Sequence, residues 1–143
     1  MSTRTVLVLL FCTAAVLAQG KSSDKVIKAT AVAGKALGGT REVTITLDVD
    51  PKYYIYANPI GNKEFEENQT AVTVTGKGKL VKVEYPTGES VKDKVIGEYY
   101  VYRGKVTIKA VVEGTGPTEF AVKVQACSKT ACLLPSTLKV VAP

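Results

Sequence analysis

The sequence predicts an all-β protein, built as an antiparallel β-sandwich of about eight strands. Apolar and polar residues alternate with a period of two along several short stretches, most clearly from Glu42 to Val49 and from Lys105 to Val112. Residues that favour turns, such as Asp50-Pro51, separate these stretches. No long stretch keeps the apolar period of an amphipathic helix. Short strands joined by frequent turns are typical of two packed sheets.

The expected elements follow in chain order. The polar leader from Gln19 to Lys25 is expected to fray, and the first strand is expected to end in a turn at Gly34. The acidic segment from Phe65 to Gln69 fits a short helical turn or coil. The charged segment from Glu89 to Gly97 is expected to be a loop because it lacks alternation. The predicted strands are residues 26–33, 42–49, 71–75, 80–85, 98–102, 105–112, 120–126 and 138–140.

Residues 1–18 have the features of a secretory signal peptide. Arg4 supplies a positive charge, an apolar run extends from Thr5 to Leu17, and Ala18 ends a small-residue cleavage site. Cys12 lies inside this segment and would be removed with it. Residues 19–143 would then form a single domain with two cysteines and a net charge of 18 − 13 = +5. Because the apolar run is short and no second one follows, we expect a periplasmic or secreted protein without a membrane span.

Composition and motifs argue against several classes of function. The lysines are spread singly over strand-like segments and form no dense basic run, so we expect no nucleic-acid partner. The chain has no histidine, and two sulfurs make a thin ligand set, so we expect neither a metal nor another cofactor. The sequence contains no phosphate-binding loop and no Gly-x-Ser-x-Gly motif that would indicate phosphoryl transfer or hydrolysis.

The most informative stretch runs from Val124 to Pro135 and contains Cys127 and Cys132. An apolar alternation leads into it and another follows it, which predicts a strand, a tight connection and a second strand. Four residues separate the cysteines, so a hairpin closed by a four-residue loop would set them opposite each other. Opposed residues of an antiparallel pair have Cα atoms roughly 4.5–5.5 Å apart, within the range of a disulfide. In an oxidising compartment a disulfide is the expected state.

The spacing of the cysteines does not decide what role such a bridge would have. A ring of six residues removes only about 2 kcal/mol of denatured-state freedom, against about 5 kcal/mol for a ring of about 100 residues. One interpretation is a structural clip in a secreted β-sandwich binding module, and another is a reactive disulfide that exchanges with partners. A soft-metal carrier that uses both thiolates is the third. A reduction potential well below about −300 mV would favour the inert clip.

The tyrosines offer a second signal, because they gather in three places. Either they pack on strands with the phenol at the rim, or they form a wall around the cysteine hairpin. Such a wall would exclude oxidants and offer hydrogen bonds to a thiolate. The tyrosines are Tyr53, Tyr54 and Tyr56; Tyr85; and Tyr99, Tyr100 and Tyr102.

Three segments, in this order and spacing, resemble the N-terminal periplasmic domain of the thiol:disulfide interchange protein DsbD. They run from Tyr53 to Tyr56, from Lys92 to Ile108 and from Val124 to Pro135. The resemblance covers most of residues 26–142. It implies an immunoglobulin-like sandwich, although the tryptophan of antibody domains is missing here.

The resemblance also implies roles. In that family the domain takes electrons from a thioredoxin-like protein and passes them to exported proteins that contain disulfides, so this chain would be a protein-disulfide reductase-like component. Cys127 and Cys132 would be the redox pair, with Cys132 attacking the partner and Cys127 resolving the mixed disulfide. Lys129 is a candidate for tuning a thiol. The expected cap loop and site wall consist of Asp93, Lys94, Val95, Ile96, Gly97, Tyr54 and Tyr56.

Overall fold

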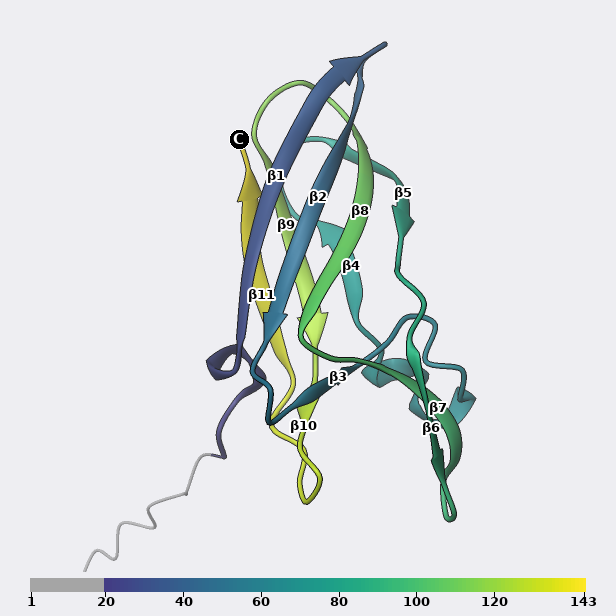
Figure 1. Ribbon diagram of the computed structural model, residues 1–143. Coiled ribbons are helices and arrows are strands. Elements are labelled where there is room, and N and C mark those ends of the chain that lie inside the picture. Colours follow the sequence, from purple (N-terminus) through teal and green to yellow (C-terminus); the bar gives the residue numbers. More distant parts are fainter. Residues whose placement is uncertain (1–19) are drawn as a thin grey trace, which may run out of the picture.

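Two antiparallel sheets form most of the molecule, and the computed structural model describes them within residues 20–143 (Figure 1). One sheet has the strand order β1-β2-β8-β5 and the other has the order β11-β9-β4. The expected signal peptide lies outside the described residues. The strands are β1 (Ile27–Leu37), β2 (Thr40–Val49), β8 (Lys105–Glu113), β5 (Lys79–Glu84), β11 (Ser136–Ala142), β9 (Thr118–Val124) and β4 (Ala71–Val74).

The core lies between these two sheets. On β2, Val43, Ile45 and Leu47 are fully buried, while Thr44 and Thr46 between them are half-buried. Phe120 and Val122 of β9 come from the opposite sheet and belong to the same apolar cluster. This burial pattern follows directly from the period-two alternation, because successive side chains of a strand point to opposite faces. The predicted antiparallel sandwich is confirmed.

A smaller sheet at one end of the sandwich carries the cysteine hairpin (Figure 1). Its strand order is β10-β3-β7-β6. Strand β3 follows β2 after the Asp50-Pro51 turn, and β10 follows β9 after Gln125, so this sheet is an extension of the sandwich strands. Its strands are β10 (Ala126–Cys127), β3 (Tyr54–Tyr56), β7 (Gly97–Tyr102) and β6 (Glu89–Asp93). Two short 3-10 helices complete the described chain, η1 (Ser23–Lys25) and η2 (Lys63–Asn68).

Two sequence predictions about element boundaries were wrong. The segment from Glu89 to Gly97 is a hairpin instead of a loop, because β6 pairs with β7 as far as the Asp93–Gly97 pair. Strand β6 is a sheet edge that faces mostly solvent, so it needs no apolar alternation. The first strand does not turn at Gly34; its pairing with β2 shifts register between Ala33 and Ala36 and continues to Leu37.

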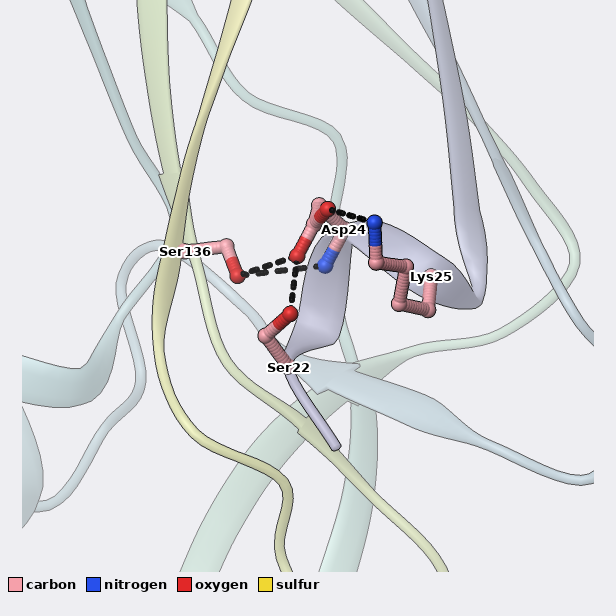
Figure 2. A network of polar contacts seen from close by, with 4 residues as sticks. All are labelled: Ser22, Asp24, Lys25 and Ser136. Atoms are coloured by element: carbon pink, nitrogen blue, oxygen red, sulfur yellow. Dashed lines mark hydrogen bonds and ion pairs between the residues drawn. The ribbon is translucent and has the colours of Figure 1, made fainter. Parts of the chain in front are cut away.

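The segment before β1 is anchored, contrary to the expected frayed leader (Figure 2). The backbone N–H of Asp24 donates to Ser136 Oγ at 3.1 Å, and the Asp24 carboxylate accepts hydrogen bonds from Ser22 and Ser136. Lys25 Nζ lies 3.3 Å from Asp24 Oδ2. The hydrogen bond from Ser22 is the main reason that the pKa of Asp24 is lowered. The network fixes the start of the described chain against β11.

Candidate functional site

The two cysteines face each other across a tight hairpin and are joined by a disulfide. Their Cα atoms are 3.9 Å apart, and Cys127 pairs with Cys132 as an antiparallel bridge. The backbone N–H of Leu133 donates to Ala126 O at 2.8 Å, and that of Ser128 donates to Ala131 O at 2.8 Å. These bonds close the four-residue connection expected from the cysteine spacing. The predicted pairing of the cysteines is therefore present.

The two bridged cysteines differ sharply in exposure. Cys127 is the last residue of β10, pairs with Tyr54 of β3, and is fully buried. Cys132 lies outside the ladder on the return of the hairpin and is exposed. A partner thiolate must reach a disulfide sulfur to attack it. The accessible side of this disulfide is therefore Cys132.

Tyr56, one of the two tyrosines expected in the site wall, reaches the disulfide. Its Oη lies 3.5 Å from Cys127 Sγ and 3.8 Å from Cys132 Sγ. A sulfur in a disulfide carries no hydrogen, so the phenol is the donor in these contacts. Burial, and secondarily the neighbouring Tyr99, raise the pKa of Tyr56. The phenol thus stays protonated and keeps its ability to donate near neutral pH.

Tyr54, the other tyrosine expected in the site wall, packs against Tyr56. Residues two apart on a strand share a face, and the rings of Tyr54 and Tyr56 meet edge-to-face with centroids 6.1 Å apart. The guanidinium of Arg103 lies over the ring of Tyr54, 5.1 Å from its centroid. Burial is the largest cause of a strongly raised pKa of Tyr54, followed by a hydrogen bond with Tyr99.

The residues expected to form a cap make the turn of the β6–β7 hairpin. Asp93 Oδ1 accepts the backbone N–H groups of Val95 at 2.7 Å and Ile96 at 3.1 Å, and these bonds lower the pKa of Asp93. Asn62 Nδ2 donates to Ile96 O at 2.9 Å. Val95 is 91% exposed, and the hairpin tip stands apart from the cysteine loop (Figure 1). In this arrangement the turn, which also contains Lys94 and Gly97, leaves Cys132 of the disulfide exposed.

The site contains residues that sequence reasoning did not assign. Ser23 is fully buried; its Oγ accepts the N–H of Ala126 at 2.9 Å and donates to Leu134 O at 2.7 Å. It therefore supports both sides of the cysteine hairpin from 103 residues away in the chain. No local pattern marks such a contact. Tyr99 and Arg103 lie in a segment that carries the family resemblance. Only the pairing of β3 with β7 shows that Tyr99 packs against Tyr56 and that Arg103 lies over Tyr54.

The described part of the chain contains no cluster of side chains that could hold a metal ion. Among residues 20–143, no three His, Cys, Asp or Glu side chains gather as a metal site. Lys129, the candidate for tuning a thiol, is exposed in the loop between the cysteines. The chemistry that this geometry allows is attack by a visiting thiolate on an accessible disulfide, with a phenol beside both sulfurs.

Comparison with known families agrees with this geometry. The sequence profile of the family described as "Thiol:disulfide interchange protein DsbD, N-terminal" matches residues 23–142. The chain belongs to this family. The predicted resemblance to the DsbD N-terminal domain is confirmed, and with it the immunoglobulin-like sandwich. No curated protein matches the chain in sequence.

Solved structures of DsbD-type domains share the fold. The reduced DsbD N-terminal domain of Neisseria meningitidis has a TM-score of 0.57 at 16% identity, over 83% of this chain and 85% of that chain. The complex of the DsbD N-terminal and PilB N-terminal domains from the same organism has a TM-score of 0.53 at 16% identity, over 78% of this chain and 80% of that chain. The N-terminal periplasmic domain of ScsB from Proteus mirabilis has a TM-score of 0.57 at 15% identity, over 80% of this chain and 45% of that chain. At such identities the likeness establishes the fold alone.

The described helices are short. Within residues 20–143, none has the length and apolar character that a membrane-crossing helix requires.

Proposed function

We propose that this DsbD N-terminal-type chain is an exported thiol:disulfide exchange domain, which passes reducing equivalents through Cys127 and Cys132. A thioredoxin-like protein would be the electron donor, and exported proteins that contain disulfides would be the acceptors. The observation that carries the proposal is the disulfide between an exposed Cys132 and a buried Cys127. Residues 1–18 would direct the chain to the periplasm or the exterior, and residues 19–143 would be the single working domain.

In the first half-reaction the donor reduces the disulfide. A thiolate of the donor attacks Cys132 Sγ, the Cys127–Cys132 bond breaks, and Cys127 leaves as a thiolate. The donor's second thiolate then attacks the donor sulfur of the mixed disulfide and releases Cys132. The donor ends with one new disulfide. This chain has gained two electrons, and two protons convert its cysteines to thiols.

In the second half-reaction the reduced pair attacks an acceptor. The Cys132 thiolate displaces one acceptor sulfur and forms a mixed disulfide with the other. The Cys127 thiolate then attacks Cys132 Sγ, re-forms the internal disulfide and releases the second acceptor thiol. The acceptor has gained two electrons and two protons. The short hairpin supports this step because it keeps the resolving sulfur next to the attacking one.

Tyr56 and the β6–β7 turn are the proposed supporting parts. The phenol of Tyr56 donates a hydrogen bond to whichever sulfur carries the negative charge, which stabilises a thiolate. The proposed cap, residues 93–97, must swing toward the pair to shield it. Its Ile96 belongs to the same apolar cluster as Tyr54 and Tyr56, which supports a link between the turn and the wall.

Trapping of mixed disulfides tests the proposal. A Cys127→Ser variant keeps the exposed thiol but cannot resolve, so it should accumulate covalent adducts with an oxidised exported protein or a model disulfide protein. Cys132→Ser is the matched control and should trap far less, because Cys127 is buried. Adducts are counted on non-reducing gels and must disappear on addition of a reductant. If neither variant forms adducts, the exchange function is refuted and the inert clip is favoured.

A further inference from the structure

A cationic groove opens beside the cysteine loop. Its volume is about 360 Å³, and its charged lining comes from three separate connections. Lys52 lies between β2 and β3, Arg103 between β7 and β8, and Lys129 between the two cysteines. The hydroxyls of Ser128 and Thr130 belong to the same lining. Three of the four residues between the cysteines, Ser128 to Thr130, therefore line the groove.

The lining of this groove carries three positive charges and no carboxylate. The Asp50 carboxylate accepts the backbone N–H of Lys52 at 2.9 Å but is not part of the lining. Within residues 20–143, neither Lys52 nor Lys129 has an ion-pair partner. Arg103 Nε lies 3.3 Å from Glu89 Oε2, but both side chains are at least half exposed, and such pairs are weak. Three cations thus surround an opening that adjoins the proposed point of attack.

We propose that the groove binds carboxylate side chains that flank the reactive cysteine of a partner protein. The inference rests on the proposed exchange function and adds which partners are favoured. Carboxylates match the lining because Lys and Arg donate charge-assisted hydrogen bonds to them, and the loop hydroxyls can donate as well. A partner with acidic residues beside its disulfide would be drawn to Cys132, while a basic partner would be repelled.

Synthetic peptides with matched sequences test the inference. Each peptide carries one cysteine as a 2-pyridyl mixed disulfide and differs only in its flanking residues, which are Glu, Gln or Lys. The protein is first reduced with a dithiol. Attack by Cys132 then breaks the peptide disulfide, joins the peptide to Cys132 and releases pyridinethione, whose absorbance gives the rate. Cys127 finally displaces the peptide as a thiol.

We expect the Glu peptide to react at least about tenfold faster than the Lys peptide at low salt, and the difference to shrink as salt increases. A Lys52→Glu, Lys129→Glu double variant should remove or reverse this preference. The matched control is Lys77→Glu, Lys79→Glu, which changes the net charge equally at exposed positions outside the groove, where Lys79 pairs with Glu113 at the end of β8. The control should keep the preference.

Each contrary result has a separate meaning. Equal rates for all three peptides would refute the groove while leaving the exchange function in place. Loss of the preference in both double variants would also refute it, because net charge alone would then explain the selectivity. If no peptide reacts with the reduced wild type, the exchange function itself fails and the groove inference falls with it.

Discussion

At the scale of single residues, burial makes a thiolate more costly at Cys127 than at the exposed Cys132. When the disulfide is reduced through Cys132, the leaving sulfur belongs to a residue with no exposed surface. An unpaired thiolate in apolar surroundings is costly, so it needs a hydrogen-bond donor. Tyr56 Oη, 3.5 Å from Cys127 Sγ, can supply one, and the raised pKa of Tyr56 keeps its proton in place.

A Tyr56→Phe substitution should therefore slow reduction of the disulfide. Loss of a hydrogen bond to a charged group costs about 1.5 kcal/mol, which corresponds to a rate roughly tenfold lower. The rate is measured by stopped-flow reduction with excess dithiothreitol. Phe keeps the ring that packs against Tyr54 and Tyr99, so the wall should remain folded.

Tyr53→Phe is the matched control for this substitution. Tyr53 is next to the same strand, but its ring lies under Lys21 Nζ, 5.6 Å from the centroid. This variant should react at the wild-type rate. If Tyr56→Phe also reacts at the wild-type rate, the phenol has no role in the exchange step, and the thiolate must be stabilised by the partner.

At the scale of elements, the β6–β7 hairpin has a rigid turn at its exposed end. The Asp93 carboxylate accepts hydrogen bonds from two successive backbone N–H groups. Asn62, in a neighbouring loop, donates a hydrogen bond to the carbonyl of Ile96. Yet Val95 at the tip contacts almost nothing. A cap that closes on the disulfide would thus move as a preformed turn.

An Asp93→Ala substitution should loosen the turn locally. Two backbone donors lose their acceptor, so amide hydrogen exchange at Val95 and Ile96 should become faster, while exchange in β8 stays unchanged. Exchange is followed residue by residue by NMR. Asp93→Asn keeps an Oδ1 acceptor and should preserve protection. Equal protection in the Ala variant would show that the side chain does not order the turn.

Element by element, the sequence was most informative where apolar alternation met a buried face. Strand β2 and the cysteine hairpin follow from local pattern and spacing alone. Strands β3, β6 and β10 account for the difference between about eight predicted strands and the eleven in residues 20–143. Two of them have three residues or fewer and the third is a solvated edge, so none shows a period that a sequence can reveal.

At the scale of the whole molecule, the site depends on segments that only the fold brings together. A place for Tyr56 in the site wall was expected from the family resemblance, but the support from Ser23 was not, because it arises from tertiary packing. Ser23 forms hydrogen bonds with both sides of the cysteine loop. The neighbouring hydrogen bonds in Figure 2, such as that from Asp24 to Ser136, keep Ser23 in place. The same burial that builds this end of the sandwich also raises the pKa of several tyrosines.

The stability of the oxidised protein should decrease in alkali because of its buried tyrosines. Burial is the largest cause of the raised pKa of Tyr54, Tyr56, Tyr85 and Tyr102, relative to an ordinary value of 10.0. A raised folded-state pKa contributes stability that is fully present below the unfolded pKa, and it is lost as the pH rises through the folded pKa. The free energy of unfolding should therefore be insensitive to these groups up to about pH 9 and fall above about pH 10.

Urea unfolding of the oxidised protein across this range provides the measurement, because disulfide-bonded cysteines do not titrate there. Tyr102→Phe should make the alkaline fall less steep, since one fewer buried phenol ionises on unfolding. This variant also loses the hydrogen bond that Tyr102 Oη donates to Pro86 O at 2.8 Å and the one that it accepts from the backbone N–H of Asn58 at 3.1 Å, so its stability should be lower at neutral pH. Only the slope with pH tests the linkage. A wild-type stability that stays level above about pH 10 would mean that these phenols ionise as easily in the folded sandwich as in the unfolded chain.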